Sequence, residues 1–120
     1  MKVTIAQTNK VLGQLAGKAA AILIRDAIAS KGSANVILAT GTSQFETLNQ
    51  LIQEEGIDWS NITMFHLDEY IGLSVTHPAS FRKYLKERFL DKVPSLKASH
   101  LINGEENPEA EINRLNMLIR

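Results

Sequence analysis

The feature that most constrains the fold is an alternation of short strand-like and longer helix-like segments along the chain. Residues 35–40 (NVILAT) and 62–67 (ITMFHL) are apolar runs rich in β-branched residues, typical of strands that are covered on both faces. Residues 2–6 (KVTIA) alternate polar and apolar side chains, and residues 100–103 (HLIN) form a weaker strand pattern. A helical pattern follows each of the four, which predicts the order β-α-β-α-β-α-β-α and a parallel sheet.

Residues that favour helix ends stand at the boundaries of the predicted helices. They are Thr8 and Gly32 for the first helix, Ser43 with Glu46 for the second, Pro78 for the third, and Asn107 with Pro108 for the fourth. Apolar residues at helical spacing are expected to face the core, for example Leu12 and Leu15 in the first helix and Ile112 and Leu118 in the last. The predicted fold is α/β, a Rossmann-like parallel sheet with helices on both faces.

Composition narrows the classes of function. Thirteen basic and thirteen acidic residues cancel, so no electrostatic argument favours nucleic acid or an anionic membrane as a partner. There is no cysteine, no apolar run of membrane-spanning length and no secretory leader, and we expect a cytoplasmic protein. The three histidines lack ligand spacing, so we expect no metal site. The sequence leaves a homo-oligomer open.

Ligands of parallel sheets bind beyond the carboxyl ends of the strands, and the loop 40–44 follows the first apolar strand. Gly41 would let the backbone approach a ligand, while Thr40, Thr42 and Ser43 supply hydroxyl groups at the start of a helix, a setting that suits a phosphate. The alternative is an ordinary turn between a strand and a helix. The loop lacks the lysine of a P-loop and does not match G-x-G-x-x-G.

Two carboxylates, Asp68 and Glu69, follow the second apolar strand directly. A carboxylate at a strand end could move a proton between carbon atoms if burial raised its pKa. It could instead cap the loop, or bind ribose hydroxyls as in nucleotide-binding folds. The residues alone leave these three interpretations open.

Two motifs carry a resemblance to a known family. FHLDEYIGLSVTHPASF (65–81) closely resembles the signature region of the glucosamine-6-phosphate deaminase (isomerase) family, which reads F-N-M-D-E-Y-x-G-L followed by a loop and H-P-x-S. LATGTSQ (38–44) resembles the phosphate loop of the same family, L-P-T-G-x-T-P. The spacing of the two motifs agrees, and the resemblance runs along essentially the whole chain.

The resemblance implies the fold shared with ribose-5-phosphate isomerase and 6-phosphogluconolactonase. It also implies a reaction: a phosphorylated amino sugar opens its ring, a proton moves from C2 to C1, and ammonia leaves to give fructose 6-phosphate, without a cofactor. By this resemblance Asp68 is the proton-transferring base and residues 40–43 hold the phosphate. Glu69 and Tyr70 are candidate substrate-loop residues, although Glu69 is expected to brace the loop and Tyr70 could equally be an anchoring aromatic.

The sequence departs from the family pattern at Ala39 and Gln44, where the family has prolines, which bears on substrate identity. A second family motif, G-x-G-x-[DN]-G-H-I-A-F-N, which carries the ring-opening residues, is absent, and so is a later phosphate-binding lysine. The last helical pattern also has no stop signal. We therefore expect residues 1–120 to be the N-terminal part of a single sugar-phosphate deaminase/isomerase domain, and to be inactive alone.

Two other functions are compatible with the motifs. Related sugar-phosphate-binding domains serve as sensors in bacterial repressors, behind a DNA-binding helix-turn-helix, but this sequence opens on a strand pattern and lacks a basic face. A 6-phosphogluconolactonase-like hydrolase would share the fold, but the D-E-Y-x-G-L stretch fits the deaminases better. The enzyme interpretation is therefore the leading one.

Overall fold

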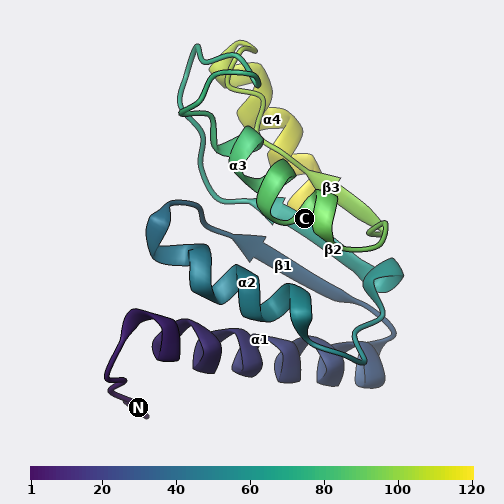
Figure 1. The fold of residues 1–120 in the computed structure, drawn as a ribbon. Helices are drawn as coiled ribbons and strands as arrows, with labels where there is room; N and C mark the ends of the chain where they lie inside the picture. Colours follow the sequence, from purple (N-terminus) through teal and green to yellow (C-terminus); the bar gives the residue numbers. More distant parts are fainter.

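A computed structural model describes all 120 residues (Figure 1). In chain order the elements are α1 (Asn9–Lys31), β1 (Ala34–Leu38), the 3₁₀ turn η1 (Thr42–Gln44), α2 (Phe45–Gln53), η2 (Trp59–Asn61), β2 (Ile62–His66), α3 (Phe81–Arg88), η3 (Leu90–Lys92), β3 (Ala98–His100) and α4 (Pro108–Ile119). The three strands form one parallel sheet in the order β1-β2-β3. This confirms the predicted α/β class, because each strand is followed by a helix.

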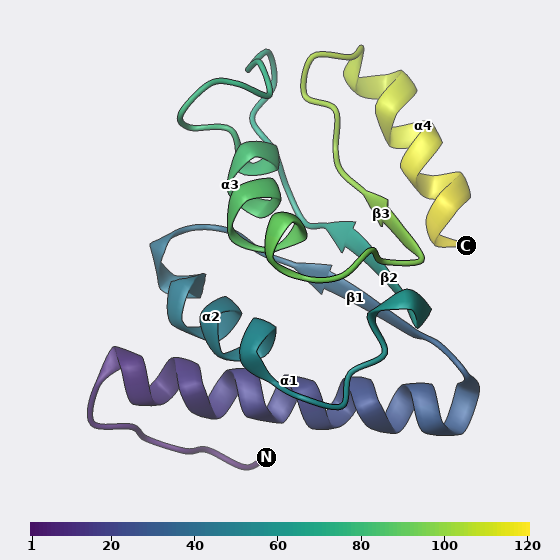
Figure 2. The same ribbon diagram turned by 45° about the vertical axis from the view of Figure 1, so that its right-hand side comes forward.

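The strand predicted at residues 2–6 is wrong. This segment has no regular structure, and Val3 and Ile5 are 69% and 92% exposed. Figures 1 and 2 show it beside α1, away from the sheet. Alternating polarity yields a strand only where a neighbouring strand can share backbone hydrogen bonds, and none of the three strands lies next to it. The strand predicted at 100–103 forms earlier, at Ala98–His100.

The register of the sheet sorts its side chains onto two faces. Ala34 pairs with Ile62, Val36 with Met64 and Leu38 with His66, and these six point to the same face. Ile62 and Met64 are fully buried there, in one core cluster with residues of α1, α2 and α3. The core therefore lies between β1–β2 and these three helices.

Helix α1 packs on α2 through small residues. Its buried positions are Gly13, Gly17, Ala21 and Ile24, and Figures 1 and 2 show the two helices side by side. A Cβ atom on Gly13 would lie 2.7 Å from the backbone carbonyl carbon of Glu46 and 2.9 Å from the next backbone nitrogen. The missing side chains are what let the two backbones approach this closely.

The larger apolar residues of the outer helices are exposed, so the prediction that they face the core is wrong for most of them. Leu12 and Leu15 in α1, and Ile112 and Leu118 in α4, are all at least 38% exposed. In α1 the contact face belongs to the small residues, which turns the long side chains outward. None of the helices, α1 included, combines the length and apolar character that crossing a bilayer requires.

The predicted ends of α1 and the predicted start of α4 are confirmed. The Thr8 hydroxyl accepts from the backbone N–H of Val11, Gly32 closes α1 with φ 80°, and Asn107 caps α4. The capping box predicted from Ser43 and Glu46 is wrong, because the turn η1 precedes α2 and no side chain caps it. Pro78 does not start a helix either. Helix α3 begins at Phe81, and the Ser80 hydroxyl caps it.

We predict that Gly13→Ala lowers the free energy of unfolding by about 1 to 3 kcal/mol, because the new methyl group meets backbone atoms that cannot move aside without separating α1 from α2. This outcome opposes helix propensity, by which alanine would be favoured over glycine by about 1 kcal/mol. Urea unfolding followed by circular dichroism measures the change.

The control for this prediction is Lys18→Ala on the exposed side of α1, which should change stability by less than about 0.5 kcal/mol. An increase in stability for Gly13→Ala would show that the close helix contact is not a constraint.

Candidate functional site

The structure brings the two predicted loops to the same edge of the sheet. Leu38 and His66 are partners at the ends of β1 and β2, and the Leu67 N–H donates to the Leu38 carbonyl at 3.1 Å. Thr40 and Asp68 each lie two residues beyond this pair. Both loops therefore start at the carboxyl ends of adjacent parallel strands, where ligands of such sheets bind.

The loop after β1 is a tight turn built on Gly41. This glycine has φ 108° and ψ 169°, a conformation essentially restricted to glycine, and its carbonyl accepts from the Gln44 N–H at 3.1 Å. Thr42 and Ser43 are exposed and line a cleft of about 530 Å³ together with the first turns of α1. Residues Gly41–Gln44 belong to the loop for which phosphate binding is predicted, and we call them the anion turn after that prediction.

The catalytic candidate Asp68 is exposed. The described chain therefore does not supply the burial on which the interpretation of Asp68 as a base depended. Asp68 shares the sheet edge with the anion turn but does not line the cleft that contains Thr42 and Ser43.

Glu69, by contrast, has a fully buried side chain. Its carboxylate accepts from the backbone N–H groups of Tyr70, Phe81 and Arg82 at 2.9–3.0 Å and from the Ser80 hydroxyl at 2.8 Å. These donors include the first N–H groups of α3, where a negative charge is favoured by the helix dipole. Glu69 therefore braces the loop, as expected, and its carboxylate is already fully engaged by the protein.

Arg82 completes this arrangement. Its guanidinium pairs with Glu69 at 3.2 Å and donates to Asn103 Oδ1 at 3.1 Å, to the Leu73 carbonyl at 2.8 Å and to Glu105 at 3.1 Å. The Arg82 side chain is 9% exposed, so the ion pair is nearly dry. One arginine thereby ties the loop after β2 to the loop after β3.

The hydrogen bonds that Glu69 accepts lower the pKa of its carboxyl group. Burial acts to raise the pKa of this carboxyl, but the bonds from the Arg82 and Phe81 backbone, the Ser80 hydroxyl and the Tyr70 backbone outweigh it and lower the pKa from 4.5 to about 2. The folded protein thus holds Glu69 ionised well into acid.

The neighbouring His66 is a buried structural residue. Its Nδ1 accepts from the Ile102 N–H at 3.2 Å, and burial lowers its pKa, although the Glu69 and Asp68 carboxylates oppose the shift. The neutral ring therefore carries its proton on Nε2, and that atom is buried without a partner, as is Thr40 Oγ1. Two unpaired buried polar atoms at the carboxyl edge of the sheet are unusual in a folded protein.

Tyr70 and His77, which also match the motifs, lie in the loop after β2. Tyr70 is exposed and its ring packs against Phe81, with centroids 4.9 Å apart. Nδ1 of His77 accepts from the Ala79 N–H at 3.0 Å, so His77 caps a turn ahead of the helix.

Sequence reasoning missed three residues that shape this edge: Ser80, Arg82 and Tyr84. Ser80 carries a usable signal, since a serine before an amphipathic segment favours an N-cap. Arg82 stands three and seven positions before Leu85 and Phe89 on the buried face of α3, where an arginine implies a buried acidic partner. In the sequence Tyr84 resembles the other residues on the apolar face of α3. No local pattern predicts that its hydroxyl reaches the Gly41 carbonyl.

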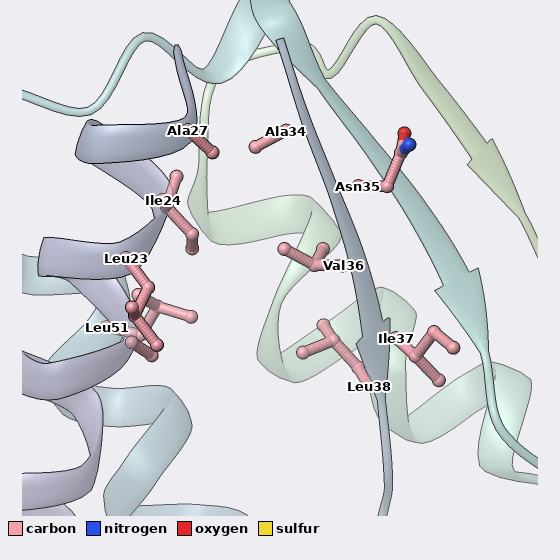
Figure 3. A pocket seen from close by; sticks show the side chains of 10 residues that line it. Leu23, Ile24, Ala27, Ala34, Asn35, Val36, Ile37, Leu38 and Leu51 are labelled. Atoms are coloured by element: carbon pink, nitrogen blue, oxygen red, sulfur yellow. The ribbon is translucent and has the colours of Figure 1, made fainter. Parts of the chain in front are cut away.

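A separate apolar groove of about 300 Å³ lies between α1 and β1 (Figure 3). Leu23 and Ile24 line it from α1, and Val36 and Leu38 from the strand, while Ile37 points the other way. It runs along the edge of β1 that pairs with no other strand. The groove contains none of the predicted site residues.

Residues 7–120 match the model of the family described as glucosamine-6-phosphate isomerases/6-phosphogluconolactonase. The chain belongs to this family. A glucosamine-6-phosphate deaminase of Exiguobacterium sp. (strain ATCC BAA-1283 / AT1b) is 37% identical over 100% of this chain and 45% of its own length. The deaminase of Streptococcus pneumoniae (strain 70585) is also 37% identical, over 99% of this chain and 48% of its own.

Two solved structures agree with this chain in fold. A monomeric glucosamine-6-phosphate deaminase superposes with a TM-score of 0.82 and 35% identity, covering 99% of this chain and 50% of that one. A 6-phosphogluconolactonase from Shewanella baltica OS155 has a TM-score of 0.80 at 19% identity, over 98% of this chain and 52% of that one, and supports the fold alone. The chain spans about half the length of the relatives it matches.

We predict that Glu69→Gln lowers the free energy of unfolding by about 3 to 5 kcal/mol at neutral pH, because it removes the buried counter-charge of Arg82 and leaves only the half-exposed Glu105. The loss should shrink in acid. Since the folded pKa of Glu69 is depressed, its contribution is complete above pH 4.5 and disappears as the pH falls towards 2. Denaturant unfolding at several pH values measures both effects.

The control is Glu87→Gln, which changes net charge equally but alters an exposed carboxylate of α3 that pairs only with Lys83. Some acid sensitivity should remain in Glu69→Gln, because hydrogen bonds from Arg114, against the opposing effect of burial, also lower the pKa of Glu111 to about 2. A difference between wild type and Glu69→Gln that stays constant from pH 6 to pH 3 would contradict the assignment.

Proposed function

We propose that this chain supplies the anion turn and the proton-transferring base of a glucosamine-6-phosphate deaminase, which isomerises and deaminates an amino-sugar phosphate to fructose 6-phosphate and ammonia. The observation that carries the proposal is the meeting of two motifs at one sheet edge: the Gly41 turn after β1 and Asp68 after β2, on adjacent parallel strands in register. Deaminase relatives at 37% identity support it.

In this proposal the anion turn binds the phosphate of the substrate. Gly41 places the backbone in a conformation that exposes Thr42 and Ser43, whose N–H and hydroxyl groups are suitable phosphate donors ahead of α2. A phosphate held at the end of β1 would position the sugar along the sheet edge towards the end of β2. Fixing the reacting carbon near a carboxylate is catalysis by placement.

Asp68 would then move the proton. Its carboxylate takes the proton from C2 of the open-chain amino aldose, the electrons shift towards the C1 carbonyl, and the C1 oxygen takes a proton from solvent, which gives a 1,2-enolamine. The protonated Asp68 returns its proton to C1, which leaves an iminium at C2. Water adds to this carbon and ammonia leaves, which gives the C2 ketone of fructose 6-phosphate. Glu69, buried in its contacts with α3, takes no proton in this scheme and holds the backbone that carries Asp68.

We further propose that residues 1–120 form the N-terminal part of a single domain, since the chain spans about half of its relatives. Ring opening would fall to residues outside this segment, so the segment alone is expected to bind sugar phosphate and release no ammonia. The absence of cysteine supports a cytoplasmic site of action. The lactonase alternative is an outcome of the binding test that follows. Sugar-phosphate binding without ammonia release in the joined polypeptide described below would favour the sensor alternative.

The binding test is a nuclear magnetic resonance titration of the 120-residue chain with glucosamine 6-phosphate. We predict shifts at the amides of Thr42, Ser43 and Asp68, because the ligand should reach both loops. Inorganic phosphate should shift the first two only, and glucosamine without phosphate neither loop. Shifts confined to other parts of the chain would contradict the proposed site, and stronger binding of 6-phosphogluconate would favour the lactonase alternative.

The base assignment is tested in a polypeptide that joins this chain to the remaining half of a deaminase domain. Asp68→Asn should reduce ammonia release by at least about 10²- to 10⁴-fold, because the amide keeps the shape but cannot accept the proton. Sugar-phosphate affinity should remain near that of the parent protein. The matched control is Asp91→Asn, an exposed aspartate in η3, and equal turnover in Asp68→Asn and the parent would overturn the assignment.

A further inference from the structure

Tyr84, in the middle of α3, contacts the first residue of the anion turn and the residue that follows the turn. Its hydroxyl donates to the Gly41 carbonyl oxygen at 2.7 Å, across 43 positions of sequence. Its ring stacks on Phe45, the residue that follows the turn, with centroids 5.6 Å apart and planes inclined by 25°. No other side chain donates to the Gly41 carbonyl, whose second bond comes from the Gln44 backbone.

A cation completes the contact. The Arg88 guanidinium lies 3.6 Å above the centre of the Phe45 ring and 5.6 Å from that of Tyr84, one helical turn further along α3. Burial raises the pKa of the Tyr84 hydroxyl, although Arg88 opposes the shift, so the phenol is a protonated donor at neutral pH. The stack of Arg88, Phe45 and Tyr84 thus holds the Tyr84 hydroxyl against the turn.

The orientation of the Gly41 carbonyl matters because a peptide unit is planar and trans. Its C=O and the N–H of the next residue point in opposite directions, so a carbonyl turned towards Tyr84 turns the Thr42 N–H away from it. Glycine at φ 108° has a wide choice of conformations and would not keep this peptide fixed unaided. A hydrogen bond to the carbonyl therefore sets the direction of the neighbouring donor.

We propose that Tyr84 is a positioning residue for the anion turn: by holding the Gly41 carbonyl it aims the Thr42 N–H at the phosphate of the substrate. This inference rests on the proposed function, in which the turn binds phosphate. It adds the specific residue that presents the turn in its binding conformation, together with the Arg88–Phe45 contact that supports that residue.

The same helix also holds the other half of the site. Its first residues, Phe81 and Arg82, donate to Glu69 next to the proposed base, and Tyr84 reaches the turn less than one helical turn later. Helix α3 is therefore a rigid spacer between the two loops, and the Tyr84 hydroxyl is its contact on the phosphate side.

The test is Tyr84→Phe in the complete 120-residue chain, which keeps the ring and removes the hydroxyl alone. We expect amide hydrogen exchange at Gln44 to accelerate about three- to tenfold, the factor for one lost neutral hydrogen bond, while exchange in β2 is unchanged. The dissociation constant for inorganic phosphate should rise by a similar factor. A purely structural loss would instead accelerate exchange in β2 and the turn together.

Lys83→Ala is the control, since the Lys83 side chain pairs with Glu87 on the same helix and hydrogen-bonds to no residue of the anion turn. Unchanged exchange at Gln44 in Tyr84→Phe would overturn the inference whether or not the chain binds phosphate. Failure of the wild-type chain to bind phosphate would contradict the proposed function instead. If Tyr84→Phe did not fold, Arg88→Gln should accelerate exchange at the same amide more weakly, and no acceleration there would also overturn the inference.

Discussion

The structure depends on one buried carboxylate. Glu69 accepts four hydrogen bonds and pairs with Arg82, and through them it joins the end of β2 to the start of α3. An ionised group out of water is costly unless its lone pairs are all used, and here the helix N-terminus and the arginine use them. The adjacent Asp68 is exposed, while Glu69 fixes the backbone beside it. Two neighbouring acids thus have opposite environments.

The parallel register of β1 and β2 places the two candidate loops side by side. Since β1 and β2 end at the same level, the turn built on Gly41 and the loop anchored by Glu69 lie at one edge, and α3 spans both. The candidate site is consequently defined by three fixed parts: a strand pair, a helix and a buried ion pair. The side chains proposed to contact a ligand, such as Thr42 and Asp68, are exposed, and these three parts hold the backbone that carries them.

Much of this arrangement could be predicted from sequence, because the apolar strands and the capped helices are local patterns. The errors arose where a local pattern needed a distant partner. Residues 2–6 alternate like a strand but have no strand beside them, and Ser43 with Glu46 has capping-box spacing but follows a 3₁₀ turn. The bond from Tyr84 to Gly41 spans 43 positions and has no local signature. For Asp68 the sequence left a base, a loop cap and a ribose ligand open, with burial as the condition for the base, and the structure shows this carboxylate exposed.

The loop from Leu73 to Ser80 is anchored at both of its ends, and this has an evolutionary consequence. Arg82 holds the Leu73 carbonyl at one end and Glu69 holds the Ser80 hydroxyl at the other, while residues 74–79 bond only with one another or with Ser80. Insertions or exchanges within this stretch would leave the flanking anchors in place. A lineage could therefore remodel the surface formed by residues 74–79 while Asp68 and Glu69 keep their positions.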